Sequence, residues 1–347
     1  EERLVQESHL APSIFFNGHM VPDYAYFLQH GFRGVLAEIQ RYRNRQLTEE
    51  EQNFYDAMEI TVEGLSLYIQ RHADLAKRLL EEENPGYDPR QLQHIIQACT
   101  RIAWEPVQTF PEALQLMWFL ICFVDYDSFG RTDQYLLPYY EASRNTGMAD
   151  AEALLWLKYT FLKIEACGGI LNMTIGGRTP DGSSAVNPLT YLILRATREL
   201  GFRSPNLSLR IRESDPDALW FEMHRSLSGG QGLPALYNDD LIVPMLVEMG
   251  YSEEESLDYC LAGCSQVILP GKSNFACDVG CYNLLKVFEL ALHDGYDVIM
   301  GKQVGPHTGE VHELDTYEKF KQAYDTQMRF MTRLGVAINN KDVSLRQ

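Results

Sequence analysis

The sequence lacks an excess of positive charge: its 347 residues include 30 lysines and arginines against 48 aspartates and glutamates, for a net charge of −18. Nucleic acids and anionic membranes are bound through basic surfaces that release counterions, so we expect neither as a partner. A long apolar run is also lacking, because a stretch such as residues 114–124 is too short for a bilayer and contains Gln115. Residues 1–3 show no signal-peptide pattern, so we expect a cytoplasmic protein.

Cysteines are few and odd in number. The chain has seven and shows no secretory signal, so we expect reduced thiols and not a disulfide framework. Four of them fall within one short window, at Cys260, Cys264, Cys277 and Cys281. Their paired spacing could place thiolates on one face of each of two helices and so form a metal site. The spacing is not that of a zinc ribbon or a common iron–sulfur motif, and our preferred interpretation includes no metal.

Hydrophobic residues, at 45% of the chain, are plentiful enough for a large buried core. Helical patterns dominate the first half. Thr48 followed by three glutamates is a typical helix start, and apolar residues at helical spacing predict a long amphipathic helix through Tyr68. After a turn cluster at residues 84–89, we expect a second helix from about Arg90 past Cys99.

From about Gly168 the sequence changes to short apolar runs separated by Gly, Pro, Asn and Asp, which predicts strands that alternate with helices. The predicted strands cover residues 170–175, 206–211, 233–237 and 260–269. The predicted helices cover residues 188–198, 216–227, 240–249 and 283–294. This alternation favours an α/β barrel-like core, and the lack of repeats or an obvious linker favours one domain over residues 1–347.

The most informative segment, residues 258–272, places Cys264 directly after Gly263 in an apolar, turn-prone stretch. Such a position presents a side chain at a loop tip inside a cavity. Taken alone, a cysteine in an apolar segment is more often an inert small hydrophobic residue. Other parts of the chain therefore decide the interpretation.

Further segments occur in the order found in a known enzyme family, and they span nearly the whole chain. With the cysteine loop, they resemble the glycyl radical enzyme family, and most closely its glycerol dehydratase and choline trimethylamine-lyase branch. Within these segments, Arg131 and Asp133 could form a structural ion pair, and residues 238–239 a turn before the next helix. The segments are residues 17–24 (NGHMVPDY), 31–34 (GFRG), 128–136 (SFGRTDQYL), 171–177 (LNMTIGG), 205–210 (PNLSLR) and 232–239 (GLPALYND).

The resemblance implies a fold and a reaction. The fold is a ten-stranded α/β barrel of two half-barrels wrapped by helices, incomplete in this chain, with Cys264 on a loop inside a closed, water-poor cavity. In the reaction, a glycyl radical oxidises the Cys264 thiol to a thiyl radical, which takes hydrogen from a small, polar, hydroxylated substrate under anaerobic conditions. Dehydration, another elimination or C–C or C–X bond cleavage follows. Cys260 matches no family role and is assigned to packing.

Four further residues are candidates for substrate binding. The dehydratase and eliminase members carry a glutamate base two residues after the cysteine, where this chain has Gln266, whose amide cannot accept a proton at physiological pH. Asp278 is a candidate replacement, because its spacing matches a substrate-binding acid; the alternative is a helix N-terminal residue. His19 and Ser128 match cavity-facing positions, and the alternatives are a core histidine and a cap or turn hydroxyl.

The sequence has no Arg-Val-x-Gly-Tyr segment, which carries the radical glycine near the C-terminus of family members. We therefore expect no bound cofactor, and we expect the glycyl radical to come from a segment or a separate glycyl-domain protein outside this chain. The resemblance also implies a radical S-adenosylmethionine activating enzyme as a partner, and a homodimer. The alternative is a catalytically silent or regulatory subunit that pairs with a complete glycyl radical enzyme.

Overall fold

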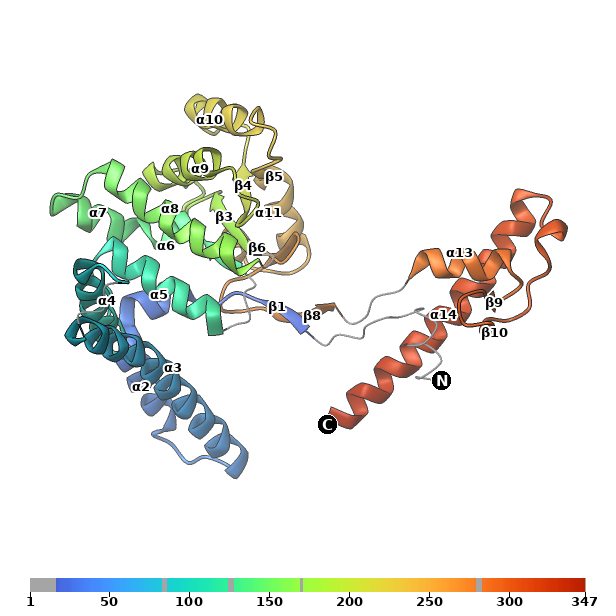
Figure 1. The fold of residues 1–347 in the computed structure, drawn as a ribbon, viewed down its shortest axis with the longest axis horizontal. Helices are drawn as coiled ribbons and strands as arrows, with labels where there is room; N and C mark the ends of the chain where they lie inside the picture. Colours follow the sequence, from blue (N-terminus) through green and yellow to red (C-terminus); the bar gives the residue numbers. More distant parts are fainter. Residues whose placement is uncertain (1–16, 83–85, 124–127, 169–170, 279–282, 347) are drawn as a thin grey trace. The chain divides into compact units, whose positions relative to one another are not determined.

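The computed structural model describes residues 17–82, 86–123, 128–168, 171–278 and 283–346 of the chain (Figure 1). These residues form two compact units. The large unit is His19–Asn274, and the small unit is made of Glu1–Gly18 together with Phe275–Gln347. The boundaries fall within strands β1 (Asn17–Met20) and β8 (Asn274–Asp278). The candidate cysteine loop lies wholly in the large unit.

The large unit begins with helices α2 (Tyr24–Arg43), α3 (Glu49–Glu81), α4 (Pro89–Ile102) and α5 (Phe110–Phe123). The predicted start of α3 is confirmed, because the Thr48 hydroxyl accepts a bond from the Glu51 N–H while the Glu51 carboxylate accepts one from the Thr48 N–H. The helix after the turn cluster is confirmed as well. Its cap is Asp88, whose carboxylate accepts a bond from the Arg90 N–H.

A four-stranded parallel sheet follows, in the order β2-β3-β4-β5. Its strands are β2 (Ser128–Arg131), β3 (Asn172–Gly176), β4 (Asn206–Ile211) and β5 (Ala235–Asn238). The connections are helical, as parallel strands require. They contain α6 (Thr132–Tyr135), α7 (Leu137–Asn145), α8 (Asp150–Cys167), α9 (Pro188–Leu200) and α10 (Asp217–Leu227), and α11 (Asp239–Glu248) and α12 (Glu253–Leu257) follow β5.

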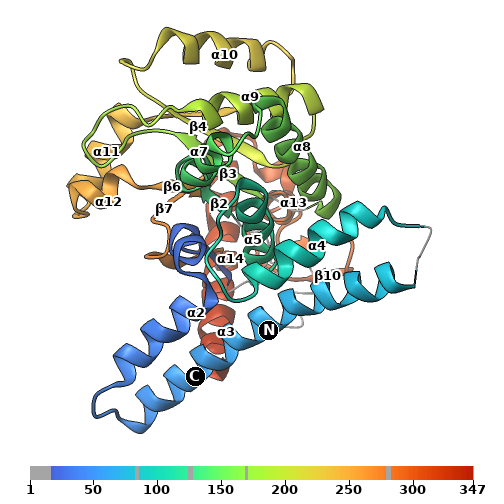
Figure 2. The ribbon, with the colours of Figure 1, turned by 90° about the vertical axis from the view of Figure 1, so that its left-hand side faces the viewer.

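The two faces of this sheet differ in polarity, because successive side chains of a strand point to opposite sides. The outer face is apolar and belongs to the main core, which also contains buried residues of α5, α8 and α9. The inner face is polar and lies toward strand β6 (Cys260–Ala262), on the other side of the sheet from α8 and α9 in Figure 2. Outer-face residues are Met173, Ile175, Leu207 and Leu209; inner-face residues include Asn172, Thr174, Ser208 and Arg210.

Residues 260–269, expected as one strand, form a hairpin instead. Strand β6 runs antiparallel to β7 (Gln266–Ile268), and Ala262 opposes Gln266 across the turn. The physical reason is Gly263, whose φ of +52° is the left-handed conformation that turns require and most residues avoid. The apolar pattern indicated extended chain correctly but did not indicate the reversal.

The small unit contains α13 (Leu284–Leu292), β9 (Tyr296–Asp297), β10 (Lys302–Gln303), the 3₁₀ helix η1 (Val311–Glu313) and α14 (Tyr317–Arg346). Its own core includes Val287, Leu290, Val304 and Met331. In neither unit does any helix of the described ranges combine the length and apolar character needed to cross a membrane.

Candidate functional site

Cys264 lies at the tip of the β6–β7 hairpin, in the turn 263–265, and is exposed in this chain. Gly263 is buried beside it, and a Cβ added at Gly263 would lie 2.2 Å from atoms of the His19 ring. The imidazole of His19 therefore lies directly against the residue before Cys264. This contact joins two segments that the sequence analysis had selected separately.

Three side chains on the inner face of the sheet hold the backbone of the hairpin. The Ser128 hydroxyl donates to the Leu261 carbonyl at 2.7 Å, and the Thr174 hydroxyl accepts from the Leu261 N–H at 2.9 Å. The Asn206 amide donates to the carbonyl of Cys264 at 3.3 Å. Because each contact comes from a different strand, the position of the cysteine loop is set by the register of the sheet.

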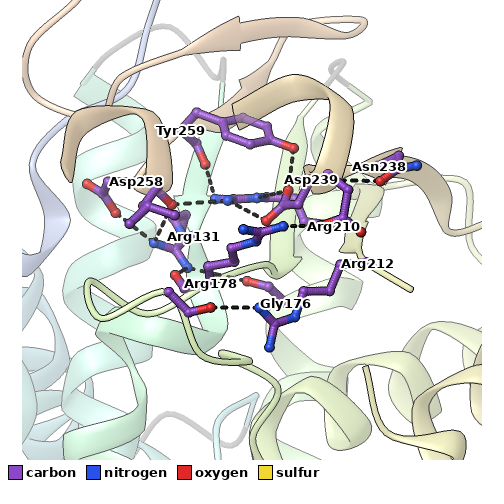
Figure 3. A network of polar contacts seen from close by, with 12 residues as sticks. Arg131, Gly176, Arg178, Arg210, Arg212, Asn238, Asp239, Asp258 and Tyr259 are labelled. Carbon is purple, nitrogen blue, oxygen red and sulfur yellow. Dashed lines mark hydrogen bonds and ion pairs between the residues drawn. The ribbon is translucent and has the colours of Figure 1, made fainter. Parts of the chain in front are cut away.

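A buried arginine fixes the start of the hairpin (Figure 3). Arg210, at the end of β4, forms an ion pair with Asp239 at 2.8 Å and donates to the carbonyls of Tyr259 at 2.6 Å and Leu257 at 3.0 Å. Its guanidinium carbon also lies 3.7 Å from the centroid of the Tyr259 ring, whose hydroxyl donates to Asp239 at 2.7 Å. Burial opposes the charge of Arg210, but the bonds to Asp239 prevail and raise its pKa.

Arg131, at the end of β2, also binds the residues just before the hairpin (Figure 3). It pairs with Asp258 at 2.9 Å and donates to the carbonyl of Leu257 at 3.3 Å and to that of Arg178 at 2.7 Å. Burial, and next the charge of Arg210, lower the pKa of Arg131. Two arginines thus converge on the residues just before the hairpin.

Arg131 therefore forms its ion pair with Asp258 and not with Asp133, which corrects the sequence interpretation. Asp133 is fully buried and accepts bonds from the Gly176 N–H at 2.8 Å and from the Thr190 hydroxyl at 2.6 Å. Burial raises the pKa of this carboxyl. Its role is to tie α6 to β3 and α9.

The remaining predicted site residues differ in what surrounds them. Ser128 is fully buried, and its hydroxyl donates to the Leu261 carbonyl and accepts from the Gly130 N–H at 3.1 Å; its role in substrate binding stays a prediction. Gln266 is half-buried, and its Oε1 is a buried atom without a hydrogen bond in the described structure. Asp278 ends β8, but its side chain lies outside the described residues. Its role stays a prediction.

The proposed four-cysteine site can be checked only at Cys260 and Cys264, and these two side chains lie in different surroundings. Cys260 is fully buried in the main core, as its assignment to packing predicts, whereas Cys264 is exposed. The side chain of Cys277 and all of Cys281 lie outside the described residues. Among side chains that are described, no three His, Cys, Asp or Glu residues are grouped so that they could hold a metal ion.

The enclosure expected around Cys264 is also not formed by the described residues. Within the large unit, the parallel sheet beside the loop has four described strands with β2 and β5 as its edges, so these strands do not close into a barrel. Sequence reasoning missed Arg210, Asp239 and Thr174 as residues that hold the hairpin. Arg210 lay within a selected segment, but a strand pattern does not indicate which acid an arginine meets.

Comparisons with known proteins match this geometry to one family. The family model described as pyruvate formate lyase-like matches residues 11–344. Among curated proteins, the isethionate sulfite-lyase of Nitratidesulfovibrio vulgaris is 32% identical over an alignment 338 residues long, which covers 88% of this chain and 41% of that protein. The chain thus spans about two fifths of the length of such relatives.

Two solved structures carry the same fold. The glycerol-bound, B12-independent glycerol dehydratase of Clostridium butyricum superposes with a TM-score of 0.79 at 27% identity, over 98% of this chain and 46% of that one. A glycyl radical enzyme from Archaeoglobus fulgidus superposes with a TM-score of 0.74 at 27% identity, over 93% of this chain and 45% of that one. The expected α/β fold is confirmed, as an incomplete part of a glycyl radical enzyme barrel.

Proposed function

The chain belongs to the pyruvate formate lyase-like family of glycyl radical enzymes, and on this basis we propose that it provides the thiyl-radical loop of a radical lyase or dehydratase. The observation that carries the proposal is the placement of Cys264. Its side chain lies at the tip of a hairpin whose backbone is bound by Ser128, Thr174 and Asn206 from three parallel strands. A group that must meet a substrate carbon repeatedly needs such a fixed backbone.

The proposed reaction is redox-neutral over a full cycle. The Cys264 thiyl radical takes a hydrogen atom from a substrate carbon, so that a C–H bond breaks and the S–H bond forms. The bond from the adjacent carbon to its leaving group then breaks. When hydroxide leaves, it takes up the proton released from the retained hydroxyl and departs as water. The product radical finally takes the hydrogen atom back from Cys264, which restores the thiyl radical.

The chain's own polar groups would hold the substrate beside the sulfur. We assign Gln266 to a hydroxyl of the substrate, because its buried Oε1 has no bond in the described structure and a hydroxyl can donate to it; a carboxylate would instead be held through the amide N–H. His19 lies against Gly263 and faces the same loop. Since Gln266 cannot take a proton at neutral pH, either another carboxylate serves as base, with Asp278 as the candidate, or the reaction needs no base at this position.

The substrate class follows from the relatives by analogy. The names of the matched proteins refer to isethionate, sulfopropanediol and hydroxyproline, and one solved relative contains glycerol. We therefore propose a small, hydroxylated compound and elimination or C–X cleavage as the reaction class. The proposed partners are a radical S-adenosylmethionine activating enzyme, a glycyl radical segment or separate glycyl-domain protein, and a second copy of the chain. We also propose the cytoplasm as the location.

The test is anaerobic electron paramagnetic resonance combined with turnover. The protein is incubated with an activating enzyme, with and without a candidate glycyl-domain partner, and hydroxylated substrates are then added. We expect a glycyl radical doublet and substrate turnover only when the glycyl-domain partner is present. Cys264→Ala should retain the doublet, because the glycyl radical is upstream of the thiol, but should lose turnover entirely.

Cys167→Ala is the matched control, because Cys167 is likewise exposed and lies in the large unit on α8. It should turn over substrate at the wild-type rate. A doublet with full turnover in Cys264→Ala would remove the role assigned to Cys264. No radical under any condition would favour the silent or regulatory subunit.

A further inference from the structure

Two polar side chains on the inner face of the sheet have no hydrogen-bond partner among the described residues, although the polar side chains beside them do. On β4, Asn206 binds the Cys264 carbonyl and Arg210 binds the Tyr259 carbonyl, while Ser208 between them makes no hydrogen bond in the described structure. On β3, Thr174 binds the Leu261 N–H, while neither amide atom of Asn172 is bonded within that same part of the chain. The unused groups thus alternate with groups that hold the hairpin.

The location of these groups makes their lack of partners costly. Asn172 and Ser208 are both fully buried, and all three of their polar side-chain atoms are shielded from solvent. Each buried polar group without a hydrogen bond costs about 1–3 kcal/mol. A leucine or alanine at either position would avoid this cost if the positions served packing alone. The retained polarity therefore indicates a ligand.

The two side chains lie on neighbouring strands beneath the cysteine loop. In the β3–β4 register, Asn172 opposes Asn206, which binds the Cys264 carbonyl, and Thr174 opposes Ser208. Neighbouring strands are about 4.8 Å apart, so the amide of Asn172 lies within one or two strand spacings of the Cys264 backbone. On its other side Asn172 opposes Ser128, which binds the Leu261 carbonyl.

The chemistry of the three atoms selects the ligand. The Asn172 amide offers one oxygen acceptor and one nitrogen donor, and the Ser208 hydroxyl can do either. A group that both donates and accepts satisfies them, whereas an anion would leave the Asn172 oxygen unpaired and a cation would leave its nitrogen unpaired. The charges nearest on β4 cancel, because Arg210 is paired with Asp239. The matching ligand is a neutral hydroxyl group.

We propose that Asn172 and Ser208 form a hydroxyl-binding subsite beneath the Cys264 hairpin. It rests on the proposed function and deepens it, because it assigns one hydroxyl of the substrate to named residues on β3 and β4. The same chemistry is met by an ordered water that would support the hairpin from below. The experiment below separates these two sources.

Binding is measured on the unactivated protein by equilibrium dialysis with radiolabelled glycerol as the neutral hydroxylated probe. Because no radical is needed, this binding test can fail while the proposed radical reaction is supported. Equally, the radical reaction can fail while glycerol binding is observed. Asn172→Leu should weaken glycerol binding about tenfold, which corresponds to about 1.4 kcal/mol. Ser208→Ala, a smaller change, should weaken it about threefold. Asn145→Ala, on the exposed end of α7, is the control and should bind as wild type does.

A high-resolution crystal structure of the glycerol-free protein completes the test. If Asn172→Leu binds glycerol normally but a water is observed between Asn172 and Ser208, the subsite stands with water as its ligand. If no density lies there, and both variants bind glycerol like the wild type and are at least as stable, the subsite is refuted. The last result would mean that the unpaired groups are simply tolerated.

Discussion

Arg210 and Asp239 form a two-point ion pair with no exposed surface, in which Nε lies 2.9 Å from Oδ1 and Nη2 lies 2.8 Å from Oδ2. The pair joins the end of β4 to the first residue of α11, 29 residues later in the chain. Its second role is to fix the residues before the hairpin, through the carbonyls of Tyr259 and Leu257. One contact therefore contributes both to the stability of the fold and to the position of the residues that lead into the Cys264 hairpin.

Breaking this pair should be strongly destabilising. Asp239→Asn leaves the buried charge of Arg210 without its counterion, and loss of one partner of a buried pair costs about 3–5 kcal/mol. The free energy of unfolding in urea measures the effect. Glu222→Gln is the control, because the Arg198–Glu222 pair has the same 2.8 Å distance but both side chains are 21% exposed. It should cost under about 1 kcal/mol. Equal costs would contradict the structural role of the buried pair.

Gly263→Ala tests the packing of the cysteine turn. The new methyl would meet the His19 ring at 2.2 Å and would also require a positive φ of +52°. We expect a loss of stability of about 2 kcal/mol or more, and loss of turnover, since strain and overlap each contribute about 1 kcal/mol or more. Gly168→Ala separates the two effects, because Gly168 has a φ of +68° and open space around it. In the Gly263→Ala variant, the second change His19→Ala should restore part of the lost free energy of unfolding, because it removes the ring that the new methyl group overlaps.

Thiol alkylation should distinguish the cysteines of the folded 347-residue chain. Cys264 and Cys167 are exposed and should react with iodoacetamide at pH 8, whereas Cys99 should react only after unfolding. Cys99 is 2% exposed, and burial raises its pKa to about 11, so it stays a thiol at this pH. Mass spectrometry of the digested protein measures the order in which the cysteines are alkylated. If a complete barrel encloses the loop, Cys264 should react at least tenfold more slowly in the whole enzyme.

Replacement of Gln266 tests the missing base. Gln266→Glu places a carboxylate two residues after Cys264, where it can accept a proton, so elimination activity should appear or change and should rise with pH as the carboxyl ionises. Gln266→Leu is the matched variant that removes hydrogen bonding and supplies no base. It should weaken substrate binding without a new product. Product profiles by mass spectrometry measure both, and an unchanged profile in Gln266→Glu would show that base loss does not define the reaction.

Acid should remove the contribution of Glu199. Hydrogen bonds from Lys158, at 2.5 Å, and Arg195, at 2.6 Å, lower the pKa of this carboxyl to about 2. Because the folded pKa lies below the ordinary value of about 4.3, the stabilisation is complete above that value and is lost as the pH falls toward 2. The stability difference between wild type and Glu199→Gln should therefore shrink between pH 5 and pH 3. A constant difference over that range would argue against these bonds.

Local patterns determined much of the fold. The cap at Thr48 and the strand at residues 206–211 were predicted at their observed positions, because capping and short apolar runs are local signals. Strand β2 was missed, since its four residues, Ser128–Arg131, are all buried and show no alternation. The hairpin was missed because a left-handed glycine turn does not interrupt an apolar pattern.

By itself, the sequence determined the family, the α/β class and Cys264 as the candidate radical residue, because the order of motifs is a property of the chain alone. Only the tertiary structure paired Arg210 with Asp239, placed His19 against Gly263 and left the buried Asn172 side chain without a hydrogen bond in the described part of the chain. These relationships join residues far apart in the chain, and they follow from strand register and from which face of the sheet each side chain occupies. Neither is specified until the strands have assembled.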